Sequence, residues 1–381
     1  MDRKLRMGMI GGGNGAFIGA IHRAAALMDN QIELVCGCFS SRPDVSLASG
    51  REYFLSDERI YASFREMIER EAALPEGVRM DFVSIVTPNF LHFEPAMAAL
   101  DRGFDVVLDK PMTYSLDEAY RLREKIRETG RTLALTHTYS GYPAVKEARE
   151  RVANGVFGKI RKIYVEYPQG WLSDRAELQP GSNAGWRTDP ARAGKAGCMG
   201  DIGTHALDLT LWCMNNYKPK YCVGSVYKKL GKKFPTGNAW GDWTEEQFTV
   251  EDSAFGFIVM ENGATINLES SWALNMLDTR EAVTTLCGTD GGLDMNDGIR
   301  INGIRHGRQY VLKPDLSAGG VAFYEGSNGA KPEDREAALW IDAVVNDKPP
   351  FVLPEQAYAV SQILEGIYIS AKTGEPYYFN K

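Results

Sequence analysis

Residues 5–137 alternate short apolar runs with stretches of helical periodicity, and this alternation constrains the fold more than any other feature. The apolar runs, which we expect to be strands, are Leu5–Ile10, Ile32–Phe39, Phe82–Val86, Asp105–Leu108 and Thr132–Thr136. The stretches between them, which we expect to be helices, are Ala16–Met28, Ser63–Leu74, His92–Arg102 and Leu116–Thr129. Such alternation predicts a parallel sheet with right-handed crossovers, and continuous apolar strands predict helices on both faces. We therefore expect an α/β domain over residues 1–138.

The pattern changes after residue 138. We expect a helix at Ala144–Asn154, a strand at Lys159–Pro168, a helix at Ile202–Met214 and closing helices at Pro332–Asn346 and Pro354–Thr373. Further strands are expected at 221–227, 247–260, 263–272 and 280–287, separated by glycine-containing turns. Residues 139–381 should therefore form an α+β domain with a large open, mostly antiparallel sheet.

Composition excludes several classes of function. The formal charge of −7 without a dense run of lysine and arginine argues against nucleic-acid binding. No apolar run approaches the roughly 20 residues that a membrane-spanning helix needs, and no signal peptide is recognisable. The six cysteines lack CxxC or metal-ligand spacing, so we expect no metal and a reducing, cytoplasmic location.

A glycine-rich turn follows the first expected strand. Gly11, Gly12, Gly13 and Gly15 precede a helix that holds Gly19. Glycines at this place let the backbone approach a pyrophosphate, and the helix N-terminus presents N–H donors to it. Gly11 and Gly13 fit the usual spacing, but the glycine that packs against the helix is Gly19, two residues late. We expect a bulged dinucleotide-binding turn.

The ends of the other expected strands supply further candidate cofactor ligands. Ser40, Ser41 and Arg42 follow the second strand; no acid stands there, so the choice between NAD and NADP stays open. His92 is either a nicotinamide-side residue or a helix-start residue, and His22 is expected to pack rather than to react. The full expected cofactor set is Gly11, Gly13, Asn14, Ala16, Phe17, Ile18, Ser40, Ser41, Arg42, Thr87, Pro88, Asn89, His92, Asp109 and Lys110.

Lys110 lies between Asp109 and Pro111, directly after the fourth expected strand. Ligands of a doubly wound sheet bind outside the carboxyl ends of its strands, so this lysine should point at whatever the glycine turn holds. The alternative is a surface lysine before a turn proline.

Asp201 and His205 follow a glycine-rich segment and should share one face of the expected helix at 202–214. Histidine exchanges protons near neutral pH and suits general acid–base work. Asp201 could instead serve only as a helix cap.

These motifs together resemble the Gfo/Idh/MocA oxidoreductase family, which includes glucose–fructose oxidoreductase and inositol dehydrogenases. The resemblance covers nearly the whole chain. It rests on the glycine turn, Thr87-Pro88-Asn89, Asp109-Lys110-Pro111, the segment Asp201 to His205, and the terminal run from Ile367 to Gly374. It implies a Rossmann dinucleotide-binding domain at 1–138 and a substrate-binding and oligomerisation domain at 139–381. It further implies Lys110, Asp201 and His205 as catalytic residues. Departures are the bulged turn and Asp109 where glutamate is commoner.

The resemblance implies hydride transfer between NAD(H) or NADP(H) and a secondary hydroxyl of a sugar, glycoside or cyclitol, possibly position 3 of a glucose-like ring. His205 would remove the hydroxyl proton while Lys110 donates a hydrogen bond to the same oxygen, and Asp201 would orient the substrate. The expected substrate shell is Lys110, His137, Tyr139, Trp171, Arg187, Asp201 and His205. Arg187 could bind an anionic group, bind a neutral sugar, or only pair with Asp189.

Two other functions remain open: an NAD-dependent redox-assisted glycosidase, with Tyr142 as a possible base, and a non-catalytic dinucleotide-binding regulator. The retained Lys110, Asp201 and His205 favour the dehydrogenase. Alternating apolar residues over 247–272 suggest a homodimer or homotetramer formed through the second sheet.

Overall fold

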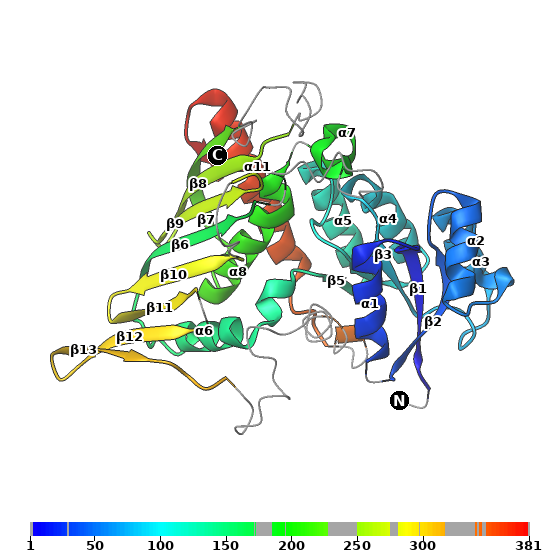
Figure 1. The fold of residues 1–381 in the computed structure, drawn as a ribbon, viewed down its shortest axis with the longest axis horizontal. Helices are drawn as coiled ribbons and strands as arrows, with labels where there is room; N and C mark the ends of the chain where they lie inside the picture. The colour runs from blue at the N-terminus through cyan, green and yellow to red at the C-terminus, as the bar shows by residue number, and fades with distance from the viewer. Residues whose placement is uncertain are drawn as a thin grey trace, which may run out of the picture. The chain divides into compact units, whose positions relative to one another are not determined.

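A five-stranded parallel sheet forms the centre of the first unit in the computed structural model (Figure 1). Its order is β2-β1-β3-β4-β5. The strands are β1 (Leu5–Gly11), β2 (Ile32–Cys38), β3 (Phe82–Val86), β4 (Asp105–Leu108) and β5 (Leu133–Leu135). The helices are α1 (Phe17–Leu27), α2 (Pro43–Glu52), α3 (Phe64–Ala73), α4 (Phe93–Asp101) and α5 (Leu116–Thr129). The expected alternation and parallel sheet are confirmed.

The structure describes residues 3–28, 30–170, 172, 185–194, 196–227, 250–274, 281–296, 298–316, 340, 343–344 and 348–379. Two compact units divide the chain: 1–138 with 331–358, and 139–330 with 359–381. Residues 331–358 thus belong to the first unit, whereas a single boundary after residue 138 would assign them to the second. Of the expected helix Pro332–Asn346, only residues 340, 343 and 344 lie within the described part.

Apolar clusters lie on both faces of the first sheet. One contains Cys36 and Cys38 with residues of α3, α4 and α5. The other joins Met7 and Met9 to α1 and to Trp340, which is fully buried. Burial on both faces explains why the strands are continuously apolar rather than alternating.

A nine-stranded sheet forms the second unit, in the order β13-β12-β11-β10-β6-β9-β8-β7-β14. Its strands are β6 (Ile160–Pro168), β7 (Pro219–Tyr227), β8 (Ser253–Met260), β9 (Thr265–Ser271), β10 (Val283–Gly288), β11 (Gly291–Met295), β12 (Arg300–Arg305), β13 (Arg308–Leu312) and β14 (Tyr377–Tyr378). The β6–β9 pair is parallel and the other pairs are antiparallel. The expected mostly antiparallel sheet is confirmed.

Helices α6 (Pro143–Ala153), α8 (Thr204–Met214) and α11 (Pro354–Thr373) accompany this sheet (Figure 1). α11 packs closely on β7 and β8, since a Cβ on Gly224 would lie 2.3 Å from the Ile367 carbonyl oxygen. The other face presents Tyr164, Phe255 and Phe257, which are partly or wholly exposed. The sheet is therefore covered by helices on one face, within the described residues.

Three sequence expectations differ from the structure. Helix α2 was not expected, because Pro43–Glu52 lacks apolar periodicity and buries only Ser46, Ser49 and Gly50. Strands β11 to β14 were also not expected: β11 begins with two glycines, every residue of β13 is exposed, and β14 has two residues. The expected strand at 247–260 begins only at Ser253; residues 247–249 lie outside the described part.

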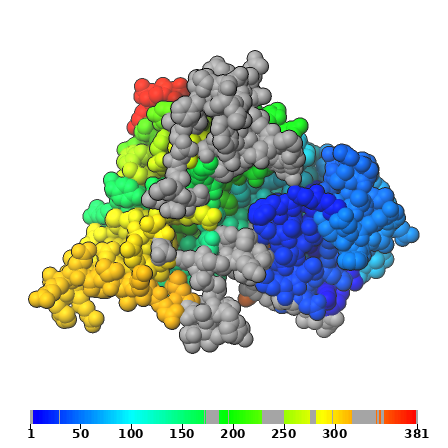
Figure 2. All heavy atoms as spheres, in the orientation of Figure 1, coloured from blue at the N-terminus to red at the C-terminus, as the bar shows by residue number. Residues whose placement is uncertain are grey.

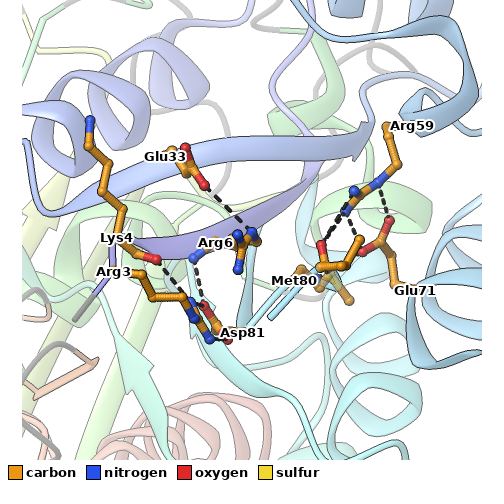
Figure 3. A network of polar contacts seen from close by, with 9 residues as sticks. Arg3, Lys4, Arg6, Glu33, Arg59, Glu71, Met80 and Asp81 are labelled. Atoms are coloured by element: carbon orange, nitrogen blue, oxygen red, sulfur yellow. Dashed lines mark hydrogen bonds and ion pairs between the residues drawn. The ribbon is translucent and has the colours of Figure 1, made fainter. Parts of the chain in front are cut away.

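A buried carboxylate on α3 bonds the segment 59–61 and Met80, which lies just before β3 (Figure 3). Glu71 of α3 is fully buried and accepts both arms of Arg59 at 2.7 Å. The Tyr61 hydroxyl and the Met80 amide also donate to it, at 2.7 and 2.9 Å. The bidentate ion pair and its two further donors replace the water that a buried carboxylate loses.

His22 of α1 packs inside the first unit rather than facing solvent. It is fully buried, its Nδ1 lies 2.9 Å from the Ser84 Oγ, and its ring stacks on Trp340 at 6.2 Å. Burial lowers the pKa of His22 from 6.5 to about 4, and the Asp109 carboxylate partly opposes this shift. The expected packing role of His22 is confirmed.

The buried His22 predicts a specific acid sensitivity. Between pH 6.5 and 4 the unfolded chain binds a proton that the folded chain excludes. Stability is therefore complete above pH 6.5 and lost as pH falls through 4, by roughly 3 kcal/mol. His22→Asn should flatten the decline in unfolding free energy measured with urea across this range. His306→Asn, at an exposed turn, is the control. An unchanged slope in His22→Asn would contradict the assignment.

Candidate active site

The carboxyl ends of β1, β3, β4 and β5 lie at one edge of the first sheet. Gly11 at the end of β1 pairs with Val86 at the end of β3, and Ile85 pairs with Leu108 at the end of β4. Leu108 in turn pairs with Leu135. The turns after these strands carry four of the predicted cofactor or substrate segments, so parallel pairing places these segments together.

Gly19 of α1 approaches the backbone of Gly12 closely. A Cβ on Gly19 would lie 2.3 Å from the Gly12 Cα and 3.0 Å from the Gly12 carbonyl oxygen. Gly11, Gly12 and Gly15 have φ angles of +83°, +71° and +81°, which glycine adopts without strain. The late glycine is therefore the one that packs against the turn, as the sequence predicted.

The turn leaves the N-terminus of α1 available to an anion. Ala16 is the N-cap and forms no side-chain capping bond, and the first turn holds no acidic residue. Phe17 is 76% exposed at this end, so it does not fill the approach to the helix N–H groups. These features fit a pyrophosphate, which the helix dipole and free amides stabilise.

Two residues that the sequence analysis missed, Arg23 and Tyr53, bond the main chain of this turn. Arg23 donates to the Gly12 carbonyl at 2.7 Å, and the Tyr53 hydroxyl donates to the same oxygen at 3.1 Å. The Arg23 guanidinium lies 3.9 Å from the centre of the Tyr53 ring. Helical spacing after the turn could have suggested Arg23; nothing in the sequence pointed to Tyr53.

The residues after β2 leave the adenosine end open. Arg42 forms an ion pair with Asp44 at 2.8 Å, with both side chains about 70% exposed. Ser40 accepts a hydrogen bond from the Arg42 amide, and the Asn14 amide donates to Ser49. Exposed pairs of this kind contribute little, so Arg42 stays available to a ligand.

His92 joins the loop after β3 to the loop that carries Lys110. It is fully buried, with Nε2 2.8 Å from the Thr87 carbonyl and Nδ1 2.8 Å from the Pro111 carbonyl. A neutral imidazole donates through one nitrogen only, so it donates to one of these two carbonyls at a time. Burial lowers the pKa of His92, and the Asp109 carboxylate opposes this. The bonds of both ring nitrogens go to the protein, so His92 positions these two loops.

Asp109 and His137 also lie at this edge. The Thr136 hydroxyl donates to the Asp109 carboxylate at 3.0 Å, which ties the loop after β4 to the end of β5. His137 is 2% exposed and follows directly. Lys110, between Asp109 and Pro111, is half-buried.

Asp201 and His205 lie on adjoining turns in the second unit. Asp201 is inside a π-helical turn, Met199–Gly203, and His205 is in the first turn of α8. Gly203 is the N-cap of α8, so Asp201 does not cap this helix. Asp201 instead pairs with Arg187 at 3.4 Å, while Asp189 caps α7 (Pro190–Ala193) and pairs with Arg192. The alternative pairing of Arg187 with Asp189 is therefore wrong.

Glu251, which precedes β8, fixes the segment that leads to Asp201. It is 2% exposed; both its oxygens accept the Gly197 amide, at 2.8 and 2.7 Å, and one accepts the Met199 amide at 3.1 Å. The Tyr368 hydroxyl of α11 donates to it at 2.6 Å. Burial raises the pKa of Glu251, and these donors oppose the shift. The glycine-rich segment before Asp201 is thus held in place, and nothing in the sequence pointed to Glu251.

Two tyrosines from the first residues of the second unit, Tyr139 and Tyr142, form a chain of ring contacts with His205. The Tyr139 ring meets the His205 ring edge-on at 4.8 Å, and the Tyr142 ring lies 5.6 Å from Tyr139. Tyr139 also bonds Tyr167, a residue of β6 that the sequence analysis missed. The predicted Trp171 lies outside the described residues.

The two halves of the chain match two family descriptions. Residues 5–137 match the oxidoreductase family with an NAD-binding Rossmann fold, and residues 145–294 match the GFO/IDH/MocA C-terminal domain. The chain belongs to the Gfo/Idh/MocA oxidoreductase family. Its first unit is therefore an NAD-binding Rossmann domain, as the glycine turn predicted.

Relatives of this family member include D-glucoside 3-dehydrogenase of Escherichia coli, 26% identical over 97% of this chain and 96% of that protein. An uncharacterized oxidoreductase of Bacillus subtilis is 28% identical over 69% of this chain and 63% of its own length. Among solved structures, an inositol dehydrogenase homolog from Azotobacter vinelandii in complex with NAD+ superposes with a TM-score of 0.84. It is 25% identical and covers 100% of this chain and 98% of that one.

These matches make the protein an oxidoreductase whose relatives include sugar and cyclitol dehydrogenases, with a nicotinamide dinucleotide as its cofactor. Within the described residues, no helix combines the length and apolar character needed to cross a bilayer.

The Gly12–Gly19 contact predicts a sharp loss of cofactor binding in Gly19→Ala. The added methyl must push α1 away from the turn, which moves the helix N–H groups from the pyrophosphate. We expect the dinucleotide dissociation constant to rise more than about ten-fold, measured by fluorescence titration. Gly103→Asn, where an added Cβ meets nothing within 4 Å, should leave it unchanged. A folded Gly19→Ala protein with unaltered affinity would contradict this account.

Proposed function

We propose that this protein is an NAD(P)-dependent dehydrogenase that acts on a secondary hydroxyl of a sugar, glycoside or cyclitol. Position 3 of a glucose-like ring is the first candidate. The proposal rests on the placement of Asp201 and His205 on adjoining helical turns of the second unit, since a carboxylate and an imidazole so placed suit proton transfer from an alcohol oxygen. Similarity to D-glucoside 3-dehydrogenase over 97% of the chain supports position 3.

In the proposed mechanism, His205 accepts the proton of the reacting hydroxyl. Lys110 donates a hydrogen bond to the same oxygen and stabilises the charge that grows on it. Asp201, held by Arg187, orients the substrate and favours the protonated imidazole that forms. A bound nicotinamide would supply the hydride acceptor for this oxidation of the carbinol carbon to a ketone. Gly11, Gly13 and Asn14, with the first residues of α1, would hold the pyrophosphate, and Thr87, Pro88 and Asn89 would face the nicotinamide end.

A substrate panel tests the proposal. Purified protein is mixed with NAD+ or NADP+ and a series of glycosides, free sugars and cyclitols, and reduced nicotinamide is followed by its near-ultraviolet absorbance. Accumulation of reduced cofactor with a polyol supports the dehydrogenase. Release of aglycone without net reduction would indicate the redox-assisted glycosidase, and tight dinucleotide binding without turnover would indicate a regulator.

Both cofactors belong in the panel because the end of β2 lacks the acid that usually selects NAD, while Arg42 and Asp44 both follow closely. We propose that NADP is accepted, with Ser40, Ser41 and Arg42 facing its 2′-phosphate. Arg42 is exposed, and its ion-pair partner among the described residues is an equally exposed carboxylate, which a phosphate can displace.

Removing either proton-handling side chain should stop the chemistry and spare cofactor binding. Lys110→Ala and His205→Ala should each lower kcat by roughly two to four orders of magnitude, since general acid–base groups contribute about that much. Dinucleotide affinity, measured by fluorescence titration, should stay near the wild-type value. Lys372→Ala and His306→Ala, at exposed positions, serve as controls. Near-normal turnover in either first variant would overturn the assigned roles.

We further propose that the open face of the second sheet pairs with a second copy, giving a homodimer or homotetramer. A hollow of about 420 Å³ on this face is lined by residues of β6 to β10, among them Tyr164, Val223 and Phe257. These three side chains are 45%, 41% and 39% exposed, and exposed apolar side chains gathered on one face often mark an interface. Strands β12 and β13, orange at the lower left of Figure 2, extend the same sheet with exposed Ile304 and Val311.

Phe257→Asp should break this association. A third carboxylate on this face, which already carries Glu166 and Glu269, would be desolvated in the interface and would repel those two. We expect light scattering to report at least twice the 42.2 kDa monomer mass for the wild type and the monomer mass for Phe257→Asp. Phe54→Asp replaces a 96% exposed phenylalanine of the first unit and should leave the mass unchanged. A monomeric wild type at micromolar concentration would end the proposal.

We place the protein in a reducing compartment, the cytoplasm. All six cysteines are free in the described residues, and five of them are buried. Buried thiols that pack as small apolar groups need no oxidising environment.

A further inference from the structure

A polar cluster lies beside His205 in the second unit and has no part in the mechanism above. The Tyr139 hydroxyl bonds the Tyr167 hydroxyl and lies 3.3 Å from the Glu281 carboxylate. The Tyr139 ring contacts the His205 ring at 4.8 Å, edge-on. Tyr139 therefore connects the proposed base to a carboxylate supplied by the residues just before β10.

Exposure differs across this cluster. Tyr139 is 8% exposed and Tyr167 is 3% exposed, whereas Glu281 is exposed. The two phenols are thus buried in the unit, and the carboxylate faces outward, where a bound molecule can reach it. Burial raises the pKa of Tyr167, and the charges of Glu281 and Asp201 raise it further. Both carboxylates therefore act on the same buried hydroxyl.

Among the described residues of this cluster, the charges do not favour an anionic ligand. Arg187, the predicted cation of the substrate shell, lies 3.4 Å from the Asp201 carboxylate. Its charge is balanced there, and its ring contact with Trp186 at 4.6 Å fixes the guanidinium further. Glu281 adds a further carboxylate. Its hydrogen-bond partner among the described residues is Tyr139, which is uncharged.

We propose that Glu281 is a substrate-binding residue and makes the site select uncharged polyols over their phosphorylated or carboxylated counterparts. The inference rests on the proposed dehydrogenase function and names its substrate class. A carboxylate accepts hydrogen bonds from two neighbouring hydroxyls of a sugar, while Tyr139 keeps it oriented. The same carboxylate repels a phosphate or a second carboxylate brought to within a few ångströms.

The test compares matched neutral and anionic substrates. Methyl glucoside, glucose 6-phosphate and glucuronate are offered to the wild type, Glu281→Gln and Tyr139→Phe. For the wild type, we expect kcat/KM for methyl glucoside to be at least about a hundred-fold higher than for glucose 6-phosphate or glucuronate. Glu281→Gln should raise KM for methyl glucoside about ten-fold, with a smaller effect on kcat. The ratio of kcat/KM between the neutral and the anionic compounds should therefore fall.

Two further measurements separate folding from recognition. Calorimetric titration of the same three compounds, without turnover, should show the same loss of neutral-sugar affinity in Glu281→Gln. Thermal unfolding and dinucleotide affinity should stay at wild-type values, because Glu281 is exposed. Asp290→Asn, an exposed acid at the other end of β10, is the control and should change nothing.

The outcomes are distinct. Absence of oxidation with every polyol defeats the proposed function itself. Oxidation of the neutral sugar with an unchanged Glu281→Gln variant defeats this inference alone. A wild type that prefers the phosphorylated or carboxylated compound also overturns it.

Discussion

The approach of α1 to the turn at Gly12 is the contact on which the NAD-binding unit depends. It sets where the helix N-terminus lies, and the Cβ that Gly19 lacks would come within 2.3 Å of the Gly12 Cα. Arg23 and Tyr53 use the Gly12 carbonyl to keep the turn closed from the other side. Recognition of the pyrophosphate therefore depends on backbone geometry, which side-chain changes elsewhere leave intact.

Two of the three proposed catalytic groups, Lys110 and Asp201, lie outside the α-helices and strands. Lys110 follows a short strand, and Asp201 lies in a π-helical turn after a glycine-rich run. In each case a buried ionisable side chain bonds the main chain: His92 at Thr87 and Pro111, and Glu251 at Gly197 and Met199. Burying such groups is costly unless every bond is made, so these contacts restrict the loops to one arrangement.

Apolar runs and glycine positions made much of the fold predictable. Strands β3 and β4 and helices α5 and α11 have the expected bounds, because local pattern alone determines them. Long-range pairings were not predictable: Glu281 meets Tyr139 across 142 residues, and Tyr53 meets Gly12 across 41. A polar residue gives no sign in sequence of which distant group it bonds. Arg187 shows the consequence, since its partner proved to be Asp201 and not its neighbour Asp189.

The proposed ligand contacts of the two units differ in kind, and this difference affects how substrate choice can change. The first uses backbone N–H groups and glycine conformations, which tolerate little change. The second would use side chains from separate segments, such as Tyr139 and Glu281, beside a sheet whose hydrogen bonds do not depend on them. A single substitution at an exposed position like Glu281 can therefore alter the charge that the substrate must carry without disturbing the sheet or the nucleotide turn. Variation among relatives that act on different sugars is expected at such positions rather than at the glycines.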